Sequence, residues 1–326
     1  MASELRKAKK WLHGADHICI LSHVSPDGDA VGSVLGLTWA LRAGGKRVTP
    51  ALADDVPSTF TFLPGCSEVA NAVPEDVDLL IALDTADVER LGSLGQDLPQ
   101  PIDINIDHHV SNSHFANINL VADDMAATSE YLVDLLEPFG LALDKQVANC
   151  LLTGLLTDSL GFRTNSTGIS TLGTAQKLLR YGAQLHEIYD RTLHRRSFES
   201  MKLWAQALGT ARCESGIAWT HVTLEGKAKI GYNASGDADV ISQLTAIEDA
   251  DVAVVLVERP DAEVKISWRA VSGVDVSEIA QFFGGGGHRA AAGASIYGVT
   301  LEQAEQDVLY RTRLALNQYL QGCSVP

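Results

Sequence analysis

Short, mainly apolar runs alternate with helix-like stretches through the first half of the chain. Residues 17–22 and 46–52 have the pattern of strands, and they flank a helix expected at 30–43. Further apolar runs lie at 78–83 and 102–106. Strands of this kind are buried on both faces, as in a parallel sheet with helical crossovers. The pattern therefore predicts an α/β domain, with helices on both faces of a parallel sheet.

The second half of the chain mixes strands and helices differently. Three strands are expected, at 217–224, 251–258 and 263–270. Helices are expected at 238–250, 275–283 and 300–321, the last with the capping-box pair Thr300 and Gln303 at its start. This pattern predicts a smaller mixed α/β domain.

The chain length also favours two domains. A single hydrophobic core stops growing at roughly 250–300 residues, and this chain has 326. We expect a first domain over 1–188, a helical linker over 189–208 and a second domain over 209–326.

Four polar clusters each follow an apolar segment of the first half. Strands of an open parallel sheet present functional groups at their carboxyl ends, so these clusters would meet in one crevice. Any one of them alone is better explained as a turn or a helix cap. The four together favour a functional site. Their members are His23, Asp27 and Asp29; Asp84; Asp107, His108 and His109; and Asp158.

Several carboxylates in one crevice need cations. Two like charges about 4 Å apart repel by roughly 1 kcal/mol in water and by about 4 kcal/mol at an effective dielectric constant of 20. Carboxylates together with imidazoles suit manganese, magnesium, iron or zinc, whereas the absence of thiolates from the set disfavours a structural zinc site. Paired metals are the arrangement that clamps the attacking and leaving oxygens in phosphoryl displacement.

Charge and composition narrow the partners. The formal net charge is −16, which argues against binding long nucleic acid through many phosphate contacts. No uninterrupted apolar stretch of about 18 residues occurs, so no membrane span is expected. The N-terminus lacks the apolar segment of a signal peptide, and the five cysteines include no C-x-x-C pair. These features predict a cytoplasmic protein with reduced cysteines, and they leave open a small phosphorylated substrate held by metals.

In order and spacing, the clusters resemble the motifs of the DHH phosphoesterases, a family named for the motif that stands here as Asp107-His108-His109. The resemblance extends to the second half, where residues 284–293 (GGGGHRAAAG) are similar to the glycine-rich signature of the DHH-associated substrate domain. Physically, consecutive glycines allow backbone N–H groups to approach an anion, although a hinge or tight turn is an alternative.

The resemblance implies a site with two divalent ions per chain, Mn²⁺ first and Mg²⁺ or another ion as the alternative. It implies that His23 and Asp27 hold one ion, that Asp29, His108 and Asp158 hold the other, and that Asp84 bridges both. Asp107 and His109 would join Asp84 in the catalytic set. Asp107 either ligates a metal or hydrogen-bonds a ligand, and His109 faces the substrate phosphate. The implied substrate-binding residues are His109, Arg269, Gly285, Gly286, Gly287 and His288.

The same resemblance is strongest to the bifunctional oligoribonuclease and pAp phosphatase group. It implies hydrolysis of short RNA oligonucleotides to 5′-mononucleotides, and of the 3′,5′-bisphosphate nucleotide pAp to AMP and phosphate. Long duplex nucleic acid and membranes are not expected partners, and a homodimer is compatible with these expectations. The alternatives are a phosphodiesterase for cyclic or linear dinucleotides and a nucleotide-binding sensor without turnover.

Overall fold

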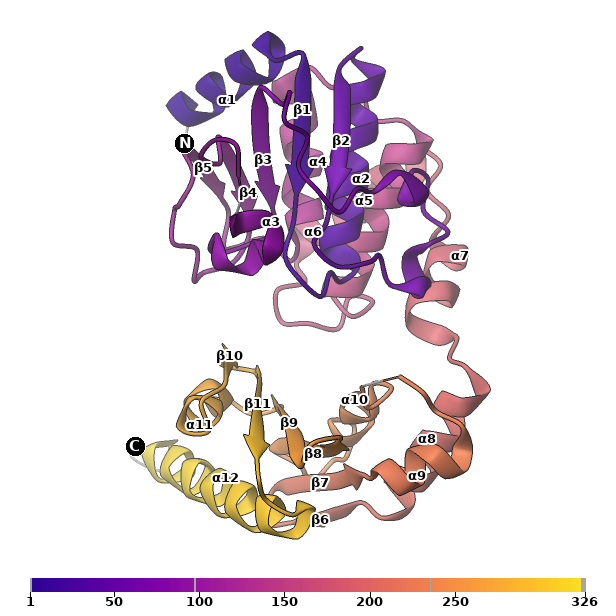
Figure 1. Cartoon of the computed structure of the whole chain (residues 1–326), viewed down its shortest axis with the longest axis vertical. Coiled ribbons are helices and arrows are strands. Elements are labelled where there is room, and N and C mark those ends of the chain that lie inside the picture. Colours follow the sequence, from indigo (N-terminus) through magenta and orange to yellow (C-terminus); the bar gives the residue numbers. More distant parts are fainter. Residues whose placement is uncertain (1, 97, 235, 324–326) are drawn as a thin grey trace. The chain divides into compact units, whose positions relative to one another are not determined.

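The computed structural model describes residues 2–96, 98–234 and 236–323, except for the side chains of Ala2, His288 and Cys323. The chain forms two compact units, the first ending at Arg195 and the second beginning at Arg196 (Figure 1). Each unit has its own sheet and its own hydrophobic core.

The first unit is built on a five-stranded parallel sheet of order β2-β1-β3-β4-β5. The expected parallel α/β architecture is confirmed. The chain leaves β1 towards β2 on one side and later returns to β3 on the other, so a topological switch point lies between β1 and β3. The strands are β1 (His17–Leu21), β2 (Arg47–Ala51), β3 (Leu79–Leu83), β4 (Ile104–Asp107) and β5 (Ile118–Val121).

Helical segments cover both faces of this sheet, but unequally. The larger core lies between one face and the long helices, and the smaller core lies under short helical turns on the other face (Figure 1). On the first face are α1 (Ala2–Gly14), α2 (Gly28–Ala43), α4 (Thr128–Phe139), α5 (Lys145–Asp158), α6 (Ile169–Arg180) and α7 (Leu185–Tyr189). On the second are η3 (Glu89–Leu91) and α3 (Ser93–Gln96). Two further short turns, η1 (Ser58–Phe60) and η2 (Cys66–Glu68), follow β2.

A row of glycines lets α2 and α5 pack at very short distance. Gly28, Gly32 and Gly36 repeat every four residues, which places them on one face of α2. A Cβ at Gly32 would lie 2.5 Å from the carbonyl oxygen of Cys150, and one at Gly28 would lie 2.2 Å from Oγ1 of Thr157. This glycine seam brings the start of α2 beside the end of α5.

The second unit contains a six-stranded mixed sheet of order β10-β11-β9-β8-β7-β6. Strands β7 and β8 are parallel, and the other neighbours are antiparallel. The expected mixed α/β architecture is confirmed. The strands are β6 (Arg212–Glu214), β7 (Ile217–Val222), β8 (Val252–Arg259), β9 (Glu263–Ala270), β10 (Gly286–His288) and β11 (Ala291–Tyr297).

Two groups of helices pack against this second sheet. α11 and α12 cover one face, where Trp268 is fully buried, and α8 and α10 cover the β7–β8 part of the other. The expected capping box is present, because Thr300 and Gln303 exchange backbone-to-side-chain hydrogen bonds. The helices are α8 (Phe198–Gly209), α9 (Leu224–Ile230), α10 (Val240–Leu244), α11 (Val276–Phe282) and α12 (Leu301–Cys323), and the π-helical turn η4 (Asp190–His194) precedes α8.

Several local expectations were wrong. The helix expected at 238–250 is limited to α10, because Leu244 is followed by turns that lead directly into β8. Strand β5 was missed, since its four residues alternate in burial and give only a weak pattern. Cys19 and Cys150 are buried, whereas Cys213 is exposed. Within the described residues, no helix has the length and apolar character needed to cross a membrane.

The glycine seam generates a stability prediction. Gly32→Ala places a methyl group against the α5 backbone, so we expect it to destabilise the protein by about 1–3 kcal/mol, the usual cost of overpacking. Gly173→Ala is the matched control, since nothing lies within 4 Å of its added Cβ on α6 and alanine favours a helix by about 0.5–1 kcal/mol. Urea unfolding measures both. Equal stability of the two variants would contradict the close packing of α2 against α5 at Gly32.

Candidate metal centre

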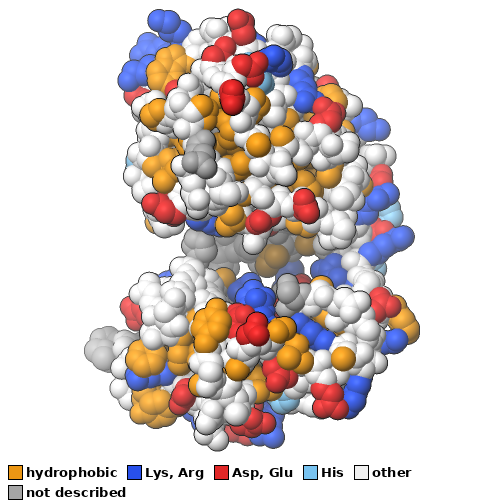
Figure 2. All heavy atoms as spheres, viewed as in Figure 1, with side chains coloured by type: hydrophobic (Ala, Val, Ile, Leu, Met, Phe, Trp, Pro, Cys, Tyr) orange, Lys and Arg blue, Asp and Glu red, His pale blue; other side chains and the backbone are white. Residues whose placement is uncertain are grey.

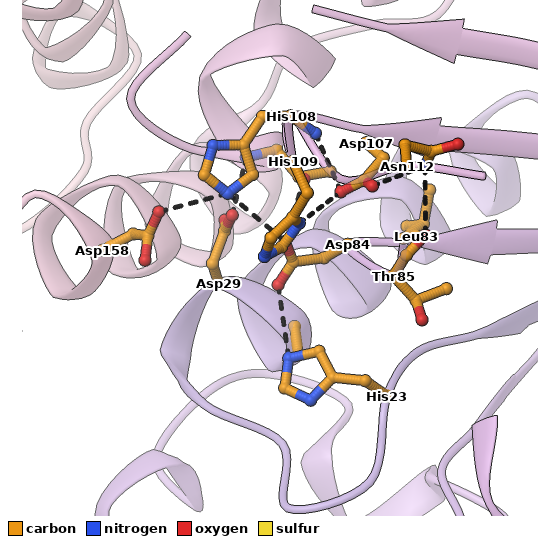
Figure 3. A network of polar contacts seen from close by, with 12 residues as sticks. His23, Asp29, Leu83, Asp84, Thr85, Asp107, His108, His109, Asn112 and Asp158 are labelled. Carbon is orange, nitrogen blue, oxygen red and sulfur yellow. Dashed lines mark hydrogen bonds and ion pairs between the residues drawn. The ribbon is translucent and has the colours of Figure 1, made fainter. Parts of the chain in front are cut away.

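The four sequence clusters meet at the carboxyl ends of β1, β3 and β4 in the first unit (Figure 3). This is the position at which open α/β sheets bind ligands, because strand order changes direction between β1 and β3. A hydrogen bond from Ser22 Oγ to the Leu83 carbonyl, 2.8 Å long, joins the ends of these two strands. Three overlapping groups of side chains have ligand atoms within 4.8 Å of one another: His23, Asp27 and Asp84; Asp29, His108 and Asp158; and Asp84, His108 and His109.

We name two halves of this cluster by their histidines. The His23 sub-site comprises His23, Asp27 and Asp84. The His108 sub-site comprises Asp84, Asp29, His108 and Asp158, so Asp84 is common to both halves.

Both naming histidines present Nε2 to the carboxylates. His23 Nδ1 lies 2.8 Å from the Val24 carbonyl oxygen, and its Nε2 lies 3.8 Å from Asp27 Oδ1. His108 Nδ1 lies 3.3 Å from the Met125 carbonyl oxygen, and its Nε2 lies 3.3 Å from Asp158 Oδ2. A carbonyl oxygen can only accept a hydrogen bond, so the Nδ1 atom beside it must carry the hydrogen. Nε2 is then the ring nitrogen that remains available to bind a metal. Metal-binding histidines commonly have this arrangement.

The carboxylate of Asp84 lies between the two sub-sites. Its Oδ2 is 3.5 Å from His23 Nε2, and its Oδ1 is 3.6 Å from His108 Nε2. Asp84 has φ 52°, in the left-handed region that aspartate tolerates better than most residues and that is common at functional sites. Its N–H donates to the Ile106 carbonyl oxygen of β4, which fixes this turn. The two oxygens of one carboxylate thus face two different histidines.

Asp27 and Asp29 enter the site from the start of α2. Asp27 is the N-cap of this helix, where its Oδ1 accepts hydrogen bonds from the N–H groups of Asp29 and Ala30. The cap interpretation of this cluster is therefore also correct, and the remaining oxygen of Asp27 is not used by the cap. Asp29 is 1% exposed, whereas the side chain of Asp27 is 57% exposed. Asp27 therefore lies at the solvent side of the cluster and Asp29 at its base.

Asp107 is completely buried and holds His109. Its Oδ1 lies 2.7 Å from His109 Nδ1, and its Oδ2 accepts a 2.6 Å hydrogen bond from Asn112 Nδ2. Asn112, which Figure 3 shows beside Asp107, in turn donates to Asn105 Oδ1. Asp107 belongs to none of the three groups of possible ligands, and its two oxygens bond His109 and Asn112, which together favour the hydrogen-bonding alternative for this residue over direct metal ligation. Such a carboxylate orients the imidazole ring that it contacts.

The pKa values of the acids show how strongly the cluster repels its own charge. Burial and then the charge of Asp84 raise the pKa of Asp29 to about 7. Burial and then Asp29 raise the pKa of Asp158 to about 8. Asp84 behaves oppositely, because burial is outweighed by His23, His108 and His109, which hold its pKa below the usual range. Two acids of the His108 sub-site therefore bind protons near neutral pH.

The pKa values of the histidines point the same way. Burial disfavours the charged form of His23, but Asp84 and Asp27 outweigh burial and raise its pKa to about 9. For His108, Asp29, Asp84 and Asp158 outweigh burial and raise the pKa to about 9. In the metal-free protein, acids and histidines of the cluster therefore bind protons more tightly than usual, and this offsets its negative charge.

The donor set fits divalent metal ions. Contacts of 3.3–3.8 Å join the two Nε2 atoms to carboxylate oxygens. Ligand atoms that share one ion at about 2.1 Å lie roughly 3–4 Å apart, so these contacts leave space for an ion between them. Carboxylates and imidazoles are the ligands of manganese, iron and zinc. A cation also replaces the protons that the acids and histidines otherwise bind.

The remaining predicted site residues lie in the second unit. Arg269 is on β9, and its Nη1 donates to the Trp268 carbonyl oxygen. Gly286 and Gly287 are on β10, Gly285 precedes it, and the side chain of His288 lies outside the described part of the chain. A Cβ at Gly285 would lie 2.1 Å from the Gly293 carbonyl oxygen, and one at Gly287 would lie 2.5 Å from that of Ala291. Close pairing with β11 therefore explains why glycine is needed at positions 285 and 287, independently of any role in substrate binding.

Thr128 and Asn112 are contacts of the cluster that sequence reasoning missed. Thr128 Oγ1 donates to Asp84 Oδ1 over 3.0 Å, and Asn112 holds Asp107 as described. Asn112 lies only five residues beyond Asp107. Thr128 begins a Thr-Ser-Glu segment with the composition of a helix start. That composition was the one sequence signal that could have indicated Thr128.

Comparisons with known proteins agree with this geometry. Residues 17–155 match the model described as DHH family, N-terminal domain, and residues 222–318 match the DHHA1 domain. A bifunctional oligoribonuclease and PAP phosphatase NrnA of Thermus thermophilus is 35% identical over 306 residues, covering 92% of this chain and 90% of the relative. A protein of the same name from Bacillus subtilis is 28% identical, covering 86% and 90%. The crystal structure of an exopolyphosphatase-related protein from Bacteroides fragilis has a TM-score of 0.89 at 27% identity, covering 98% of this chain and 97% of that one.

The raised pKa values predict how the metal-free protein responds to pH. Folded Asp29, Asp158, His23 and His108 all retain protons that the unfolded chain has lost, so stability must fall as pH rises towards the folded pKa values of about 7, 8 and 9. After treatment with EDTA, we expect the Tm to fall between about pH 6.5 and 8.5, a range below the ordinary pKa of cysteine. Saturating Mn²⁺ should remove most of this fall.

Asp158→Asn serves as the control for this measurement. The substitution removes one titrating carboxylate, so the Tm of the metal-free variant should depend less on pH. A Tm of the metal-free wild type that stays constant or rises across this range would contradict the charge balance of the cluster.

The histidine pair provides a second prediction. His108→Ala should lose metal, because His108 faces Asp84 and Asp158 through Nε2. His109→Ala should retain metal and turn over slowly, because its Nδ1 is held by Asp107. Metal content by mass spectrometry, measured beside the rate, separates the two. Equal metal loss in both variants would show that the two roles are wrongly assigned.

Proposed function

The chain belongs to the DHH family of metal-dependent phosphoesterases, and on this basis we propose that it hydrolyses short oligoribonucleotides to 5′-mononucleotides and pAp to AMP and phosphate. The substrates are those named for its relatives from Thermus thermophilus and Bacillus subtilis, which match over most of their length. The structural observation that carries the proposal is the position of Asp84, whose two oxygens face the histidines of two sub-sites.

We assign the metal ligands as follows. His23 and Asp27 would hold one ion, Asp29, His108 and Asp158 would hold the second, and Asp84 would be a ligand common to both. We propose that the two ions are Mn²⁺, one of the divalent ions that carboxylates bind. Bound there, two divalent ions supply Lewis-acid activation and stabilise the charge that develops in phosphoryl transfer.

The protein's own residues position the substrate phosphate. Asp107 holds His109 at Nδ1 and favours the tautomer with hydrogen on that nitrogen. Held in this way, the His109 ring is the group that we propose faces the phosphoryl oxygens. The hydrogen bonds from Asn112 to Asp107 and Asn105 keep this pair in a fixed orientation.

A partly exposed face of β9 and β11 supports a substrate role for Arg269. Burial alternates along β9 and β11, so one face is packed on α11 and α12 and the other is partly exposed. Paired residues share a face, and this places Lys265, Ser267 and Arg269 on the exposed one. Two cationic side chains therefore stand in one row with a hydroxyl between them. Such a row suits a nucleotide phosphate together with its ribose.

On the same face of the sheet, glycines lie near Arg269, and no side chains project from them. Gly293 of β11 pairs with Ser267 on one side and with Gly286 of β10 on the other. A Cβ at Gly286 would meet no atom within 4 Å, so the surface there is open. We propose that Gly285, Gly286 and Gly287, with His288, allow a nucleotide to approach the backbone closely next to Arg269.

Charge restricts the substrate to short chains. At −16, the protein lacks the excess of positive charge that long single strands require. On the face in Figure 2, Lys and Arg side chains are interspersed with Asp and Glu on both units. A few cationic groups together with metal ions suffice for a dinucleotide or pAp. They do not suffice for many phosphates.

The two alternative functions differ from this proposal in measurable ways. A phosphodiesterase for cyclic dinucleotides would open a ring that has no free end, whereas the relatives' names point to short linear chains and pAp. A sensor without turnover would not need a complete ligand set, and all six predicted ligands are present in the cluster. A product assay with Mn²⁺, comparing dinucleotides, pAp and cyclic dinucleotides, decides among the three.

Substrate length gives a direct prediction. Oligonucleotides of two to five residues should be hydrolysed with at least about tenfold higher kcat/KM than a strand of about 25, a length beyond the roughly 4–16 nucleotides that one binding module covers. Rates are compared at near-physiological salt, because low salt favours binding of the longer chain. Equal efficiency on the long strand would exclude the short-substrate function.

Arg269 gives a further prediction for the second unit. Arg269→Ala removes a charged hydrogen-bond donor, which is typically worth about 1.5–3 kcal/mol, so kcat/KM for dinucleotides should fall by about 10–100-fold while metal content stays unchanged. Arg313→Ala is the matched control, since this arginine of α12 pairs with Glu214 on the edge strand farthest from β10. If both variants had the same kcat/KM, Arg269 would have no part in substrate binding.

A further inference from the structure

Thr128, the first residue of α4, contacts two predicted metal ligands at once. Its N–H donates to Asp29 Oδ2 over 2.6 Å, and its Oγ1 donates to Asp84 Oδ1 over 3.0 Å. Thr128 is fully buried, and both carboxylates are at most 2% exposed. Asp29 belongs to the His108 sub-site, and Asp84 is shared between the sub-sites. One residue therefore links two ligands that come from different elements, α2 and the end of β3.

The start of α4 explains why Asp29 is held so closely. The N-cap of α4 is Ala127, which has no side chain able to accept the first helical N–H groups. Asp29 accepts them instead: Oδ2 from Thr128 and Oδ1 from the N–H of Ser129, 3.0 Å away. A carboxylate at a helix N-terminus is stabilised by these donors and by the helix dipole. Asp29 is thus both a candidate ligand and the cap of a distant helix.

Packing prevents Asp29 from moving away from this position. A Cβ at Gly154 of α5 would lie 2.5 Å from Asp29 Oδ1, so the carboxylate rests directly on the α5 backbone. Ser33 Oγ is a third donor to the carboxylate and bonds Oδ1 over 3.2 Å. Asp29 is therefore fixed on three sides, and Thr128 is placed relative to it by the helix start.

The hydroxyl of Thr128 selects one oxygen of Asp84. It bonds Oδ1, the oxygen that faces His108, whereas Oδ2 faces His23. A hydroxyl donor on Oδ1 fixes the rotation of the carboxylate about its Cβ–Cγ bond. In that orientation Oδ1 faces the His108 sub-site and Oδ2 faces the His23 sub-site.

We propose that Thr128 is a positioning residue that sets the spacing and orientation of Asp29 and Asp84, and through them the relative placement of the two metal ions. The inference rests on the two-metal assignment made for the proposed function. Thr128 itself is not a metal ligand. Residues that orient metal ligands in this way typically contribute about 10–100-fold to metal affinity or activity.

The test measures Mn²⁺ binding by calorimetric titration of the metal-free full-length protein, which does not depend on turnover. Thr128→Val keeps the size and branching of the side chain but removes the hydroxyl, so the weaker of two binding events should lose about 10–100-fold in affinity. Thr128→Ser keeps the hydroxyl and should bind both ions like wild type. With excess Mn²⁺, the kcat of Thr128→Val should recover towards wild type while KM changes little.

Thr38→Val is the matched control for loss of a buried threonine hydroxyl, because Thr38 is 1% exposed and its Oγ1 bonds only a backbone carbonyl, that of Val34, among the described contacts. It should bind both ions normally. Should Thr128→Val not fold, Thr128→Ala makes the same comparison with a smaller side chain.

The outcomes separate this inference from the proposed function. Wild type that does not bind two ions would overturn the two-metal assignment itself. Wild type that binds two ions, together with Thr128→Val of unchanged affinity, would overturn the role of Thr128 alone. A Thr128→Ser variant as weak as Thr128→Val would also overturn it, because the hydroxyl would then not be the group that matters.

Discussion

Repulsion among carboxylates gathered in one crevice is the constraint on which the first unit depends. Asp29 and Asp84 are buried beside Asp158, where like charges a few ångström apart cost several kcal/mol in a medium of low dielectric constant. Hydrogen bonds from the start of α4 and the imidazoles of His23 and His108 offset part of this cost. The rest is relieved by protons in the metal-free protein and, in our account, by divalent ions. The affinity for cations follows from the crowding.

The fold creates this crowding from segments far apart in sequence. Parallel strands end at one edge of the sheet, so the residues that follow β1, β3 and β4 meet there. The glycine seam then brings the start of α2 to the end of α5, and with it Asp29 to Asp158. Thr128 connects the strand-borne and helix-borne ligands. Sheet, seam and helix cap are thus three separate supports for one set of ligand atoms.

The sequence was sufficient to predict the parallel sheet and the meeting of the four clusters, because apolar runs and strand-end polar residues are local signals. It could not predict how Asp107 is used, since only the structure shows both of its oxygens bonded to His109 and Asn112. The role of Thr128 was also hidden, because it depends on contacts 99 and 44 residues away along the chain. The glycines at 284–287 were interpreted as an anion-binding segment or a turn, whereas close pairing with β11 is what the structure shows for Gly285 and Gly287.

Anomalous diffraction at the manganese edge, from crystals of the full-length protein grown with Mn²⁺, tests the two-metal claim most directly. The account predicts two peaks in the cluster, one beside His23 and Asp27 and one beside Asp29, His108 and Asp158, with one oxygen of Asp84 directed at each. A single peak, or two peaks of which Asp84 contacts only one, would contradict it.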